Sequence, residues 1–346
     1  MKNKLLLLLS RGLRQFVSQN EANGRFLVVS STGLGDSLWA TPALQSLRNC
    51  FPDSYIALLT TETGEQVFRN HPSVNEMIVF KDPLFWKILP LWQQLKKLKI
   101  GTVLNFHSSQ RAMLPLCASI GAKQIIGTRE INKGFDSLLT YPLHNLQQHQ
   151  IIRRLEIVEA AGAKRCTETL SFYLTPEEIL AAPKLSPGRW IALHPGSKDG
   201  FKRWPAKHFA LVGRRLQQMG YQILITGSSD ERDLMNHVAA HIPGAEISNP
   251  KLSIREFGAL LTQLSLLISN DTGPAHLGLA LGIPVITLFC PTNPTLCGPH
   301  IAPNGTSVAK PPACEPCLKR KCRSPFCLLQ IGPEDVVNSA RNVLKI

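Results

Sequence analysis

The sequence contains no apolar run long enough to cross a bilayer. Its first residues, MKNKLLLLLSRGLRQFV, include five consecutive leucines, whereas a membrane-spanning helix needs about 20 apolar residues. The run is also shorter than the apolar core of a secretory signal peptide, and no small-residue cleavage site follows it. We therefore expect residues 1–24 to form an amphipathic lead-in helix that can touch a membrane surface without spanning it.

A concentrated block of basic residues is also missing. The chain has 38 Lys and Arg against 24 Asp and Glu, a formal charge of +14, and the excess is spread over both halves. Such a charge favours anionic partners, among them nucleic acid, phosphorylated metabolites and anionic membrane surfaces, without selecting one of them.

The nine cysteines lack the even count of a disulfide framework. Five are scattered through otherwise ordinary α/β sequence: Cys50, Cys117, Cys166, Cys290 and Cys297. This usage is typical of a reducing compartment, so we expect a cytoplasmic protein.

The other four cysteines are close together near the C-terminus, with the spacing C-x2-C-x4-C-x4-C: Cys314, Cys317, Cys322 and Cys327. Four thiolates at short spacing can hold a structural zinc ion, and free thiols or a redox-labile pair are the alternatives. No catalytic metal or other cofactor is expected.

The order of apolar and polar segments predicts an α/β fold. From residue 25, short aliphatic runs alternate with helix-like segments, the pattern of a parallel sheet covered on both faces. The proline-containing stretch 174–188 interrupts this pattern, which restarts with RWIALHPG. We predict two Rossmann-like doubly wound domains, residues 25–175 and 188–333, joined by a linker and followed by a helix over 334–346. Ligands should bind where strands end.

The first strand exit reads TGLGDSLWATP. Gly33 and Gly35 allow a tight turn and close approach of a ligand to the backbone, and Asp36 stands at the start of a helix. This aspartate is either a helix cap or a general base. A dinucleotide fingerprint needs a further glycine where Leu38 stands, which disfavours a dehydrogenase.

The exits of the second predicted domain carry hydroxyl and charged groups. Ser197 and Lys202 follow its first strand in HPGSKDGFKR, a composition that suits a diphosphate but equally a solvated basic loop. Glu231 in TGSSDER either accepts hydrogen bonds from ribose hydroxyls or opens a surface helix.

The stretch SNDTGPAHLGLALG contains the triplet Asp271, Thr272 and Gly273, followed by His276. An aspartic protease needs two such aspartates in an all-β framework, and no second DTG or DSG exists in this α/β sequence. Strand, polar turn and helix instead place backbone N–H groups where an anion can dock. We expect His276 to contact the ligand.

Three motifs in order resemble one known family: GLGDSLWATPALQSLRNCFPDS (33–54), ALHPGS with KRWP (192–205), and SNDTGPAHLGLALGIPVITLFCPTNP (269–294). The chain resembles the ADP-heptose lipopolysaccharide heptosyltransferases of glycosyltransferase family 9. The resemblance implies a GT-B fold, in which two Rossmann-like domains face each other across a cleft and the last helix packs back towards the first domain.

The resemblance further implies inverting, metal-independent transfer of heptose from ADP-heptose to the lipopolysaccharide inner core, with no nucleic-acid partner. Asp36 would be the catalytic base. The donor would contact Ser197, Lys202, Glu231, Asp271, Thr272, Gly273 and His276. The alternatives are another GT-B transferase with a different nucleotide sugar, a sugar-nucleotide epimerase, or a non-catalytic binder of core oligosaccharide.

A lipid-linked acceptor gives one further segment a possible role. Residues 81–100, KDPLFWKILPLWQQLKKLKI, combine aromatic side chains with lysines. Such a segment either sits at the inner face of the cytoplasmic membrane or is an ordinary amphipathic surface helix.

Overall fold

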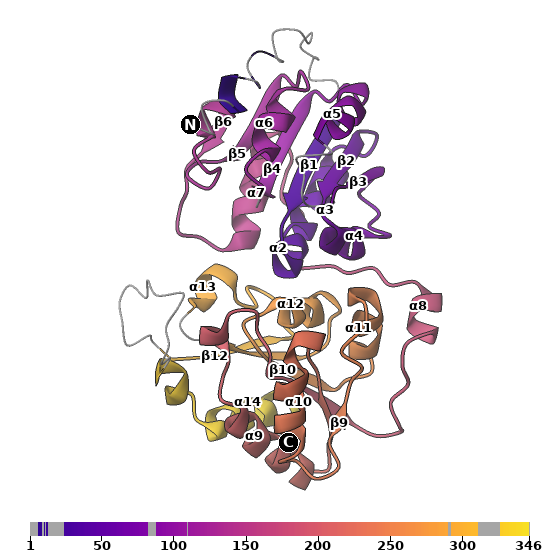
Figure 1. Cartoon of the computed structure of the whole chain (residues 1–346), viewed down its shortest axis with the longest axis vertical. Coiled ribbons are helices and arrows are strands. Elements are labelled where there is room, and N and C mark those ends of the chain that lie inside the picture. Colours follow the sequence, from indigo (N-terminus) through magenta and orange to yellow (C-terminus); the bar gives the residue numbers. More distant parts are fainter. Residues whose placement is uncertain are drawn as a thin grey trace. The chain divides into compact units, whose positions relative to one another are not determined.

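The structure is a computed structural model that describes residues 6–8, 10, 12, 24–81, 88–108, 110–289, 292–310 and 326–345. The chain divides into two compact units, unit 1 (Met1–Tyr173) and unit 2 (Leu174–Ile346). Each unit contains one six-stranded sheet. The α/β class and the two doubly wound sheets predicted from the sequence are confirmed (Figure 1).

Unit 1 alternates strands and helices from residue 25 onward. Its elements are β1 (Arg25–Ser31), α2 (Leu34–Trp39), α3 (Thr41–Cys50), β2 (Tyr55–Thr60), α4 (Glu62–Phe68), β3 (Glu76–Val79), α5 (Ile88–Lys97), β4 (Thr102–Ser108), α6 (Met113–Ala118), β5 (Gln124–Thr128), the 3₁₀ turn η2 (Asp136–Leu138), β6 (Tyr141–Leu143) and α7 (Gln150–Ala160).

The sheet of unit 1 is parallel with strand order β3-β2-β1-β4-β5-β6. The order reverses between β1 and β4, where Ser30 pairs in register with His107. In a doubly wound sheet this reversal opens a ligand crevice at the carboxyl ends of the strands. The groups that follow β1 and end β4 therefore lie at the place where a ligand is expected.

Both faces of this sheet are covered, which is why its strands read as continuous apolar runs. Leu27, Val29 and Val103 pack on one face with residues of α5 and α6 in a single buried cluster. Helix α7 packs against β4, β5 and α3.

Unit 2 repeats this plan. Its elements are α8 (Pro176–Leu180), β7 (Trp190–His194), η3 (Gly200–Lys202), α9 (Ala206–Gln218), β8 (Gln222–Ile225), η4 (Ser229–Glu231), α10 (Arg232–Ala239), β9 (Glu246–Ile247), α11 (Ile254–Leu261), β10 (Leu266–Asn270), α12 (Gly273–Ala280), β11 (Val285–Phe289), α13 (Pro294–Cys297), β12 (Gly305–Ala309), η5 (Phe326–Gln330) and α14 (Pro333–Leu344).

The second sheet is also parallel, with order β12-β11-β10-β7-β8-β9. Its reversal lies between β7 and β10, where His194 pairs in register with Ser269. Phe209, Val212 and Leu216 recur at helical spacing on α9 and enter the buried cluster of this unit. Helix α14 packs against α9 and β12. Its expected packing towards the first domain stays a prediction.

The segment expected to be a linker has structure of its own. Thr175 and Glu178 form a capping box that starts α8, and Glu178 forms an ion pair with the buried Arg255 of α11. Gln263 donates to the carbonyl of Pro183 and accepts from the N–H of Leu185. The segment is therefore anchored to unit 2 along its length, which its proline content did not indicate.

Two surface predictions fall partly outside the described residues. Residues 6–8, 10 and 12 are helical, and Leu6 and Leu7 pack against the core of unit 1; the rest of the lead-in helix lies outside. Of the segment 81–100, Trp92 donates to the carbonyl of Ser119 and lies under the Lys96 ammonium, while Phe85, Trp86 and Lys87 lie outside. Across the described ranges, no helix combines the length and apolarity that a membrane span requires. Membrane-surface binding stays a prediction.

Candidate active site

The strand exit of β1 leads directly into α2. Gly33 is the residue before the helix, with φ −79° and ψ −178°, an ordinary extended conformation. A Cβ placed there would meet no atom within 4 Å. The turn therefore does not need glycine for its backbone angles, and open space lies in front of Gly33. Gly35 is inside α2.

Asp36 lies in the first turn of α2, but it does not cap the helix. The cap position belongs to Gly33, and no side-chain cap bond is formed. Instead Oδ1 of Asp36 accepts a 2.8 Å hydrogen bond from Arg154 of α7. The interpretation of Asp36 as a helix cap is therefore wrong. Its interpretation as a general base stays a prediction.

Arg154 is 1% exposed, whereas the Asp36 side chain is 30% exposed. Its Nη1 donates to the carbonyl and side-chain oxygens of Gln150, and its guanidinium lies 5.6 Å from the centre of the Trp39 ring. Burial lowers the pKa of Arg154, and the Asp36 carboxylate opposes that shift. The partly exposed Asp36 carboxylate is therefore held by the buried Arg154 guanidinium.

His107, at the end of β4, is the third member of this group. Its Nδ1 lies 3.9 Å from Oδ1 of Asp36. Partial burial lowers the pKa of His107, Asp36 raises it, and the nearby cations Arg154, Arg153 and Lys133 lower it further. The net result is a pKa of His107 below its ordinary value, which favours the uncharged imidazole at neutral pH.

The turn after β10 is held by Asn270. Its side chain donates to the carbonyls of Pro195 and Gly196 and accepts from the N–H of Trp204. Through these bonds the exit of β10 is tied to the exit of β7, its neighbour in the sheet. The two loops that carry the predicted donor residues are thereby brought together.

Asp271 and Lys202 form an ion pair within these loops. Nζ of Lys202 lies 2.7 Å from Oδ2 of Asp271, and the side chains are 20% and 5% exposed. Nε2 of the buried His276 lies 3.9 Å from Oδ1 of the same carboxylate. The Cys297 thiol lies 4.0 Å from Oδ2. Three of the predicted donor residues are thus in one cluster, and Lys202 is the most accessible of the three.

Thr272 and Gly273 form the start of α12. No side chain caps this helix, so its first N–H groups suit an anion. A Cβ on Gly278 would approach Val285 Cγ2 to 2.8 Å, which explains how α12 packs directly on β10 and β11. The backbone docking site expected at this turn stays a prediction.

Glu231 and Ser197 occupy the β8 and β7 exits. Glu231 is 8% exposed and accepts from the N–H and hydroxyl of Ser228; it is therefore not a surface residue. A Cβ on Gly196 would meet the Glu231 carboxylate at 2.3 Å, so a larger residue there would displace that carboxylate. Ser197 is buried, and its carbonyl accepts from Nε of Arg203.

Comparison with known proteins identifies the family. The family model "Glycosyltransferase family 9 (heptosyltransferase)" matches residues 88–327. The chain belongs to glycosyltransferase family 9. It is similar to lipooligosaccharide heptosyltransferase 2 of Campylobacter jejuni, with 26% identity over 91% of this chain and 96% of that protein.

Solved structures share the fold of this family 9 chain. A glycosyltransferase family 9 protein from Veillonella parvula matches with a TM-score of 0.81 and 22% identity, over 95% of this chain and 99% of the other. The E. coli heptosyltransferase WaaC with ADP-2-deoxy-2-fluoro heptose matches with 0.72 and 20%, over 92% and 99%. The fold is GT-B, and the chain is a glycosyltransferase.

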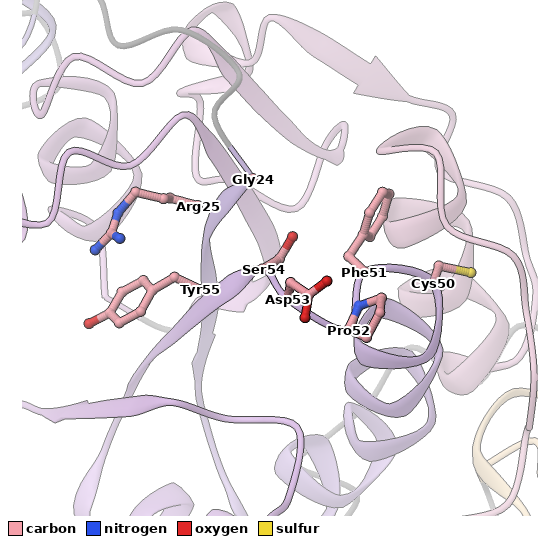
Figure 2. Close-up of a pocket in the computed structure, with 8 residues that line it drawn as sticks. All are labelled: Gly24, Arg25, Cys50, Phe51, Pro52, Asp53, Ser54 and Tyr55. Atoms are coloured by element: carbon pink, nitrogen blue, oxygen red, sulfur yellow. The ribbon is translucent and has the colours of Figure 1, made fainter.

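One cavity of unit 1 lies away from the Asp36 group. It measures about 500 Å³ and is lined by residues 24–25 and 50–55. Figure 2 shows Arg25 and Tyr55, the first residues of β1 and β2, beside it. It therefore opens at the amino ends of these strands, the opposite edge from Asp36. Ligands of doubly wound sheets bind at the carboxyl ends, so this cavity is not the candidate active site.

The zinc prediction falls mainly outside the described residues. Cys314, Cys317 and Cys322 lie there, while Cys327 is buried in the apolar cluster of unit 2. Within the described ranges, no group of three or more His, Cys, Asp or Glu is arranged to hold a metal. The zinc site stays a prediction.

Sequence reasoning missed Arg154, His107 and His194 of this family 9 chain. Arg154 stands on the apolar stripe of α7, between Ile151 and Val158, and a cation in that stripe is a usable signal. His194 ends β7, where burial lowers its pKa to about 4 and its Nδ1 lies 3.0 Å from the Thr226 hydroxyl.

Proposed function

We propose that this glycosyltransferase transfers heptose from ADP-heptose to a hydroxyl of the lipopolysaccharide inner core, with inversion at the anomeric carbon. Its similarity to lipooligosaccharide heptosyltransferase 2 supports the acceptor class. The likeness to a heptosyltransferase solved with an ADP-heptose analogue is consistent with the donor class.

The observation that carries the proposal is the state of the Asp36 carboxylate. Oδ1 is held by Arg154, while within the described part of the chain Oδ2 accepts no hydrogen bond. A fixed carboxylate with one available oxygen at the carboxyl edge of the sheet suits a general base.

In the proposed reaction Oδ2 of Asp36 takes the proton of the acceptor hydroxyl. The acceptor oxygen forms a bond to the anomeric carbon as the bond from that carbon to the ADP oxygen breaks. ADP leaves with the electron pair, and a single displacement inverts the anomeric centre. Donor binding is assigned to unit 2 through Ser197, Lys202, Glu231, Asp271, Thr272, Gly273 and His276.

We further propose that the transfer needs no metal ion. Lys202 and the first N–H groups of α12 can stabilise the negative charge that develops on ADP. Activity should survive dialysis against EDTA, measured as ADP release after removal of the chelator. Loss of more than about tenfold, restored by a divalent cation, would reject metal independence. The cytoplasmic face of the inner membrane is the proposed location, because it is where a nucleotide sugar and a lipid-linked acceptor meet.

The decisive experiment incubates the protein with ADP-heptose and a heptose-free core acceptor, followed by mass spectrometry. The expected result is an acceptor heavier by one heptosyl group, with a new anomeric configuration seen by NMR. The control reaction contains the same enzyme with ADP-glucose or UDP-N-acetylglucosamine. Transfer from one of these and none from ADP-heptose would reject the donor assignment.

A further inference from the structure

Arg154 is a cation that unit 1 buries almost completely. It is 1% exposed and lies on the inner face of α7 with Ile151, Leu155 and Val158. Its hydrogen bonds reach Gln150 of its own helix and Asp36 of α2. Asp36 is therefore its only carboxylate partner among the described residues.

Such an arrangement is poorly explained by stability. Removing a guanidinium from water is costly, and an apolar side chain of similar volume usually stabilises a core at least as well. Nε of Arg154 is buried and has no hydrogen-bond partner among the described residues, so the cation is not even fully satisfied. Folding stability alone therefore does not explain a charge in this position.

The direction of the hydrogen bond from Arg154 to Asp36 indicates a role other than folding. Arg154 reaches Oδ1 from inside the unit, and the Asp36 side chain remains 30% exposed. Asp36 does not bond to the start of α2, and the hydrogen bond that its side chain accepts comes from Arg154. A charge-assisted bond from a buried, planar donor restricts that rotamer strongly.

We propose that Arg154 is a positioning residue that holds Asp36 through Oδ1 and so directs Oδ2 towards the acceptor hydroxyl. The inference rests on the proposed role of Asp36 as the base. Nδ1 of His107 lies 3.9 Å from the same oxygen, Oδ1 of Asp36, so the titration of His107 responds to the charges around that carboxylate.

The first test compares Arg154→Met with Arg154→Lys. The Met variant should lower kcat about 10- to 100-fold, because misplacement of a reacting group by about 1 Å has effects of that size. The KM for ADP-heptose should stay within about twofold, since the donor is assigned to unit 2. The Lys variant keeps the charge and should recover part of the lost kcat, which a purely apolar packing role would not predict.

Arg48→Met is the matched control. Arg48 is a structural arginine of the same unit, and it donates to the carbonyls of Phe51, Pro52 and Ser54 and to the side chain of Asn75. These contacts lie by the cavity at the opposite edge of the sheet. The control should lower the melting temperature and leave kcat unchanged. An equal fall of kcat in both variants would overturn the proposal.

The second test is a double-mutant cycle with Asp36→Asn. If Arg154 acts only through Asp36, adding Arg154→Met to the Asn variant should change kcat by less than about twofold. Independent, multiplying effects would overturn the positioning role. Full activity of Asp36→Asn alone would instead reject the proposed base, so the two failures are distinguishable.

The third test needs no turnover and follows His107 by NMR titration of the full chain. Arg154, Arg153 and Lys133 lower the pKa of His107, whereas Asp36 raises it. Asp36→Asn should therefore lower this pKa, and it should lower it less in the Arg154→Met background, because the carboxylate no longer lies at a fixed place beside His107. An equal effect of Asp36→Asn in both backgrounds would show that Arg154 does not position Asp36, and would overturn the proposal.

Discussion

Each unit contains an aspartate paired with a basic side chain, and the two pairs differ in which partner is buried. In unit 1 the carboxylate of Asp36 is 30% exposed and its partner Arg154 is 1% exposed, with 2.8 Å between the charged atoms. In unit 2 the carboxylate of Asp271 is 5% exposed and its partner Lys202 is 20% exposed, at 2.7 Å. Each aspartate follows a strand at the reversal point of its sheet, Asp36 after β1 and Asp271 after β10.

The difference matches the two roles proposed for the units. In unit 1 the anion Asp36 is the more exposed partner, which suits the removal of a proton from a neutral hydroxyl. In unit 2 the cation Lys202 is the more exposed partner, which suits the binding of a diphosphate. Arginine is placed where a fixed geometry is needed, and lysine where a mobile point charge is sufficient.

Removing the exposed anion should have the largest effect. Asp36→Asn keeps the shape of the side chain and abolishes its basicity, so kcat should fall about 10²- to 10⁴-fold, the usual range for a general base. Binding of ADP, measured by calorimetry, should be unchanged. A variant with near-normal kcat would contradict the assignment of the anion to catalysis.

Removing the exposed cation should affect binding more than rate. Lys202→Met should weaken ADP binding by about 10- to 100-fold, because one charge-assisted contact to the diphosphate is lost. Arg154→Met provides the control and should leave ADP affinity intact. Equal losses of ADP affinity in the two variants would contradict the assignment of ADP binding to unit 2 alone.

Acidification should lower the free energy of unfolding of unit 1, because His71 is buried there. Burial lowers the pKa of this histidine to about 4, below the value of about 6.5 expected for the unfolded chain. The folded state therefore resists protonation, and its stability falls as the pH drops from about 6.5 towards 4. Between pH 7.5 and 5 the loss should be about 2 kcal/mol.

Urea unfolding at the two pH values measures this loss, with unit 1 followed separately because two units need not unfold together. His71→Gln should be less stable at pH 7.5 and should lose less stability on acidification. If acidification affects both proteins equally, His71 is not responsible.

Removing the buried anion, Asp271, should give the smallest effect, and it should strengthen ADP binding where loss of Lys202 weakens it. ADP lacks the heptose that Asp271 is proposed to contact in the donor, and in Asp271→Asn the carboxylate no longer competes for Lys202. ADP alone should therefore bind a few-fold more tightly, about 1 kcal/mol. Calorimetry with ADP checks this expectation. Weaker ADP binding in this variant would mean that Asp271 supports the diphosphate rather than competing with it.

Much of the fold could be predicted from the sequence because it rests on local patterns. Strands such as RFLVVSS are apolar on both faces, and each is followed by a helix, which specifies parallel doubly wound sheets. The motifs also indicated which strand exits carry polar groups. Residues within one exit, such as Asp271 and His276, are neighbours for the same local reason.

The partners of those residues could not be predicted in the same way. Asp36 and Arg154 are far apart in the chain and meet only because α7 packs against α2. The pairing of Lys202 with Asp271 depends on β7 and β10 lying side by side. Proline content was also misleading at 174–188, where a capping box and the ion pair of Glu178 with Arg255 outweigh it.

The anchoring of α8 sets where the chain can be divided. A fragment beginning at Leu174 retains Glu178 and the contacts of Gln263, so Arg255 keeps its carboxylate partner. A fragment beginning at residue 188 loses all of them and leaves that arginine, 3% exposed, without this counter-charge. Removing one partner of a buried pair costs about 3 to 5 kcal/mol. The proline-containing segment therefore belongs to the folding unit that follows it.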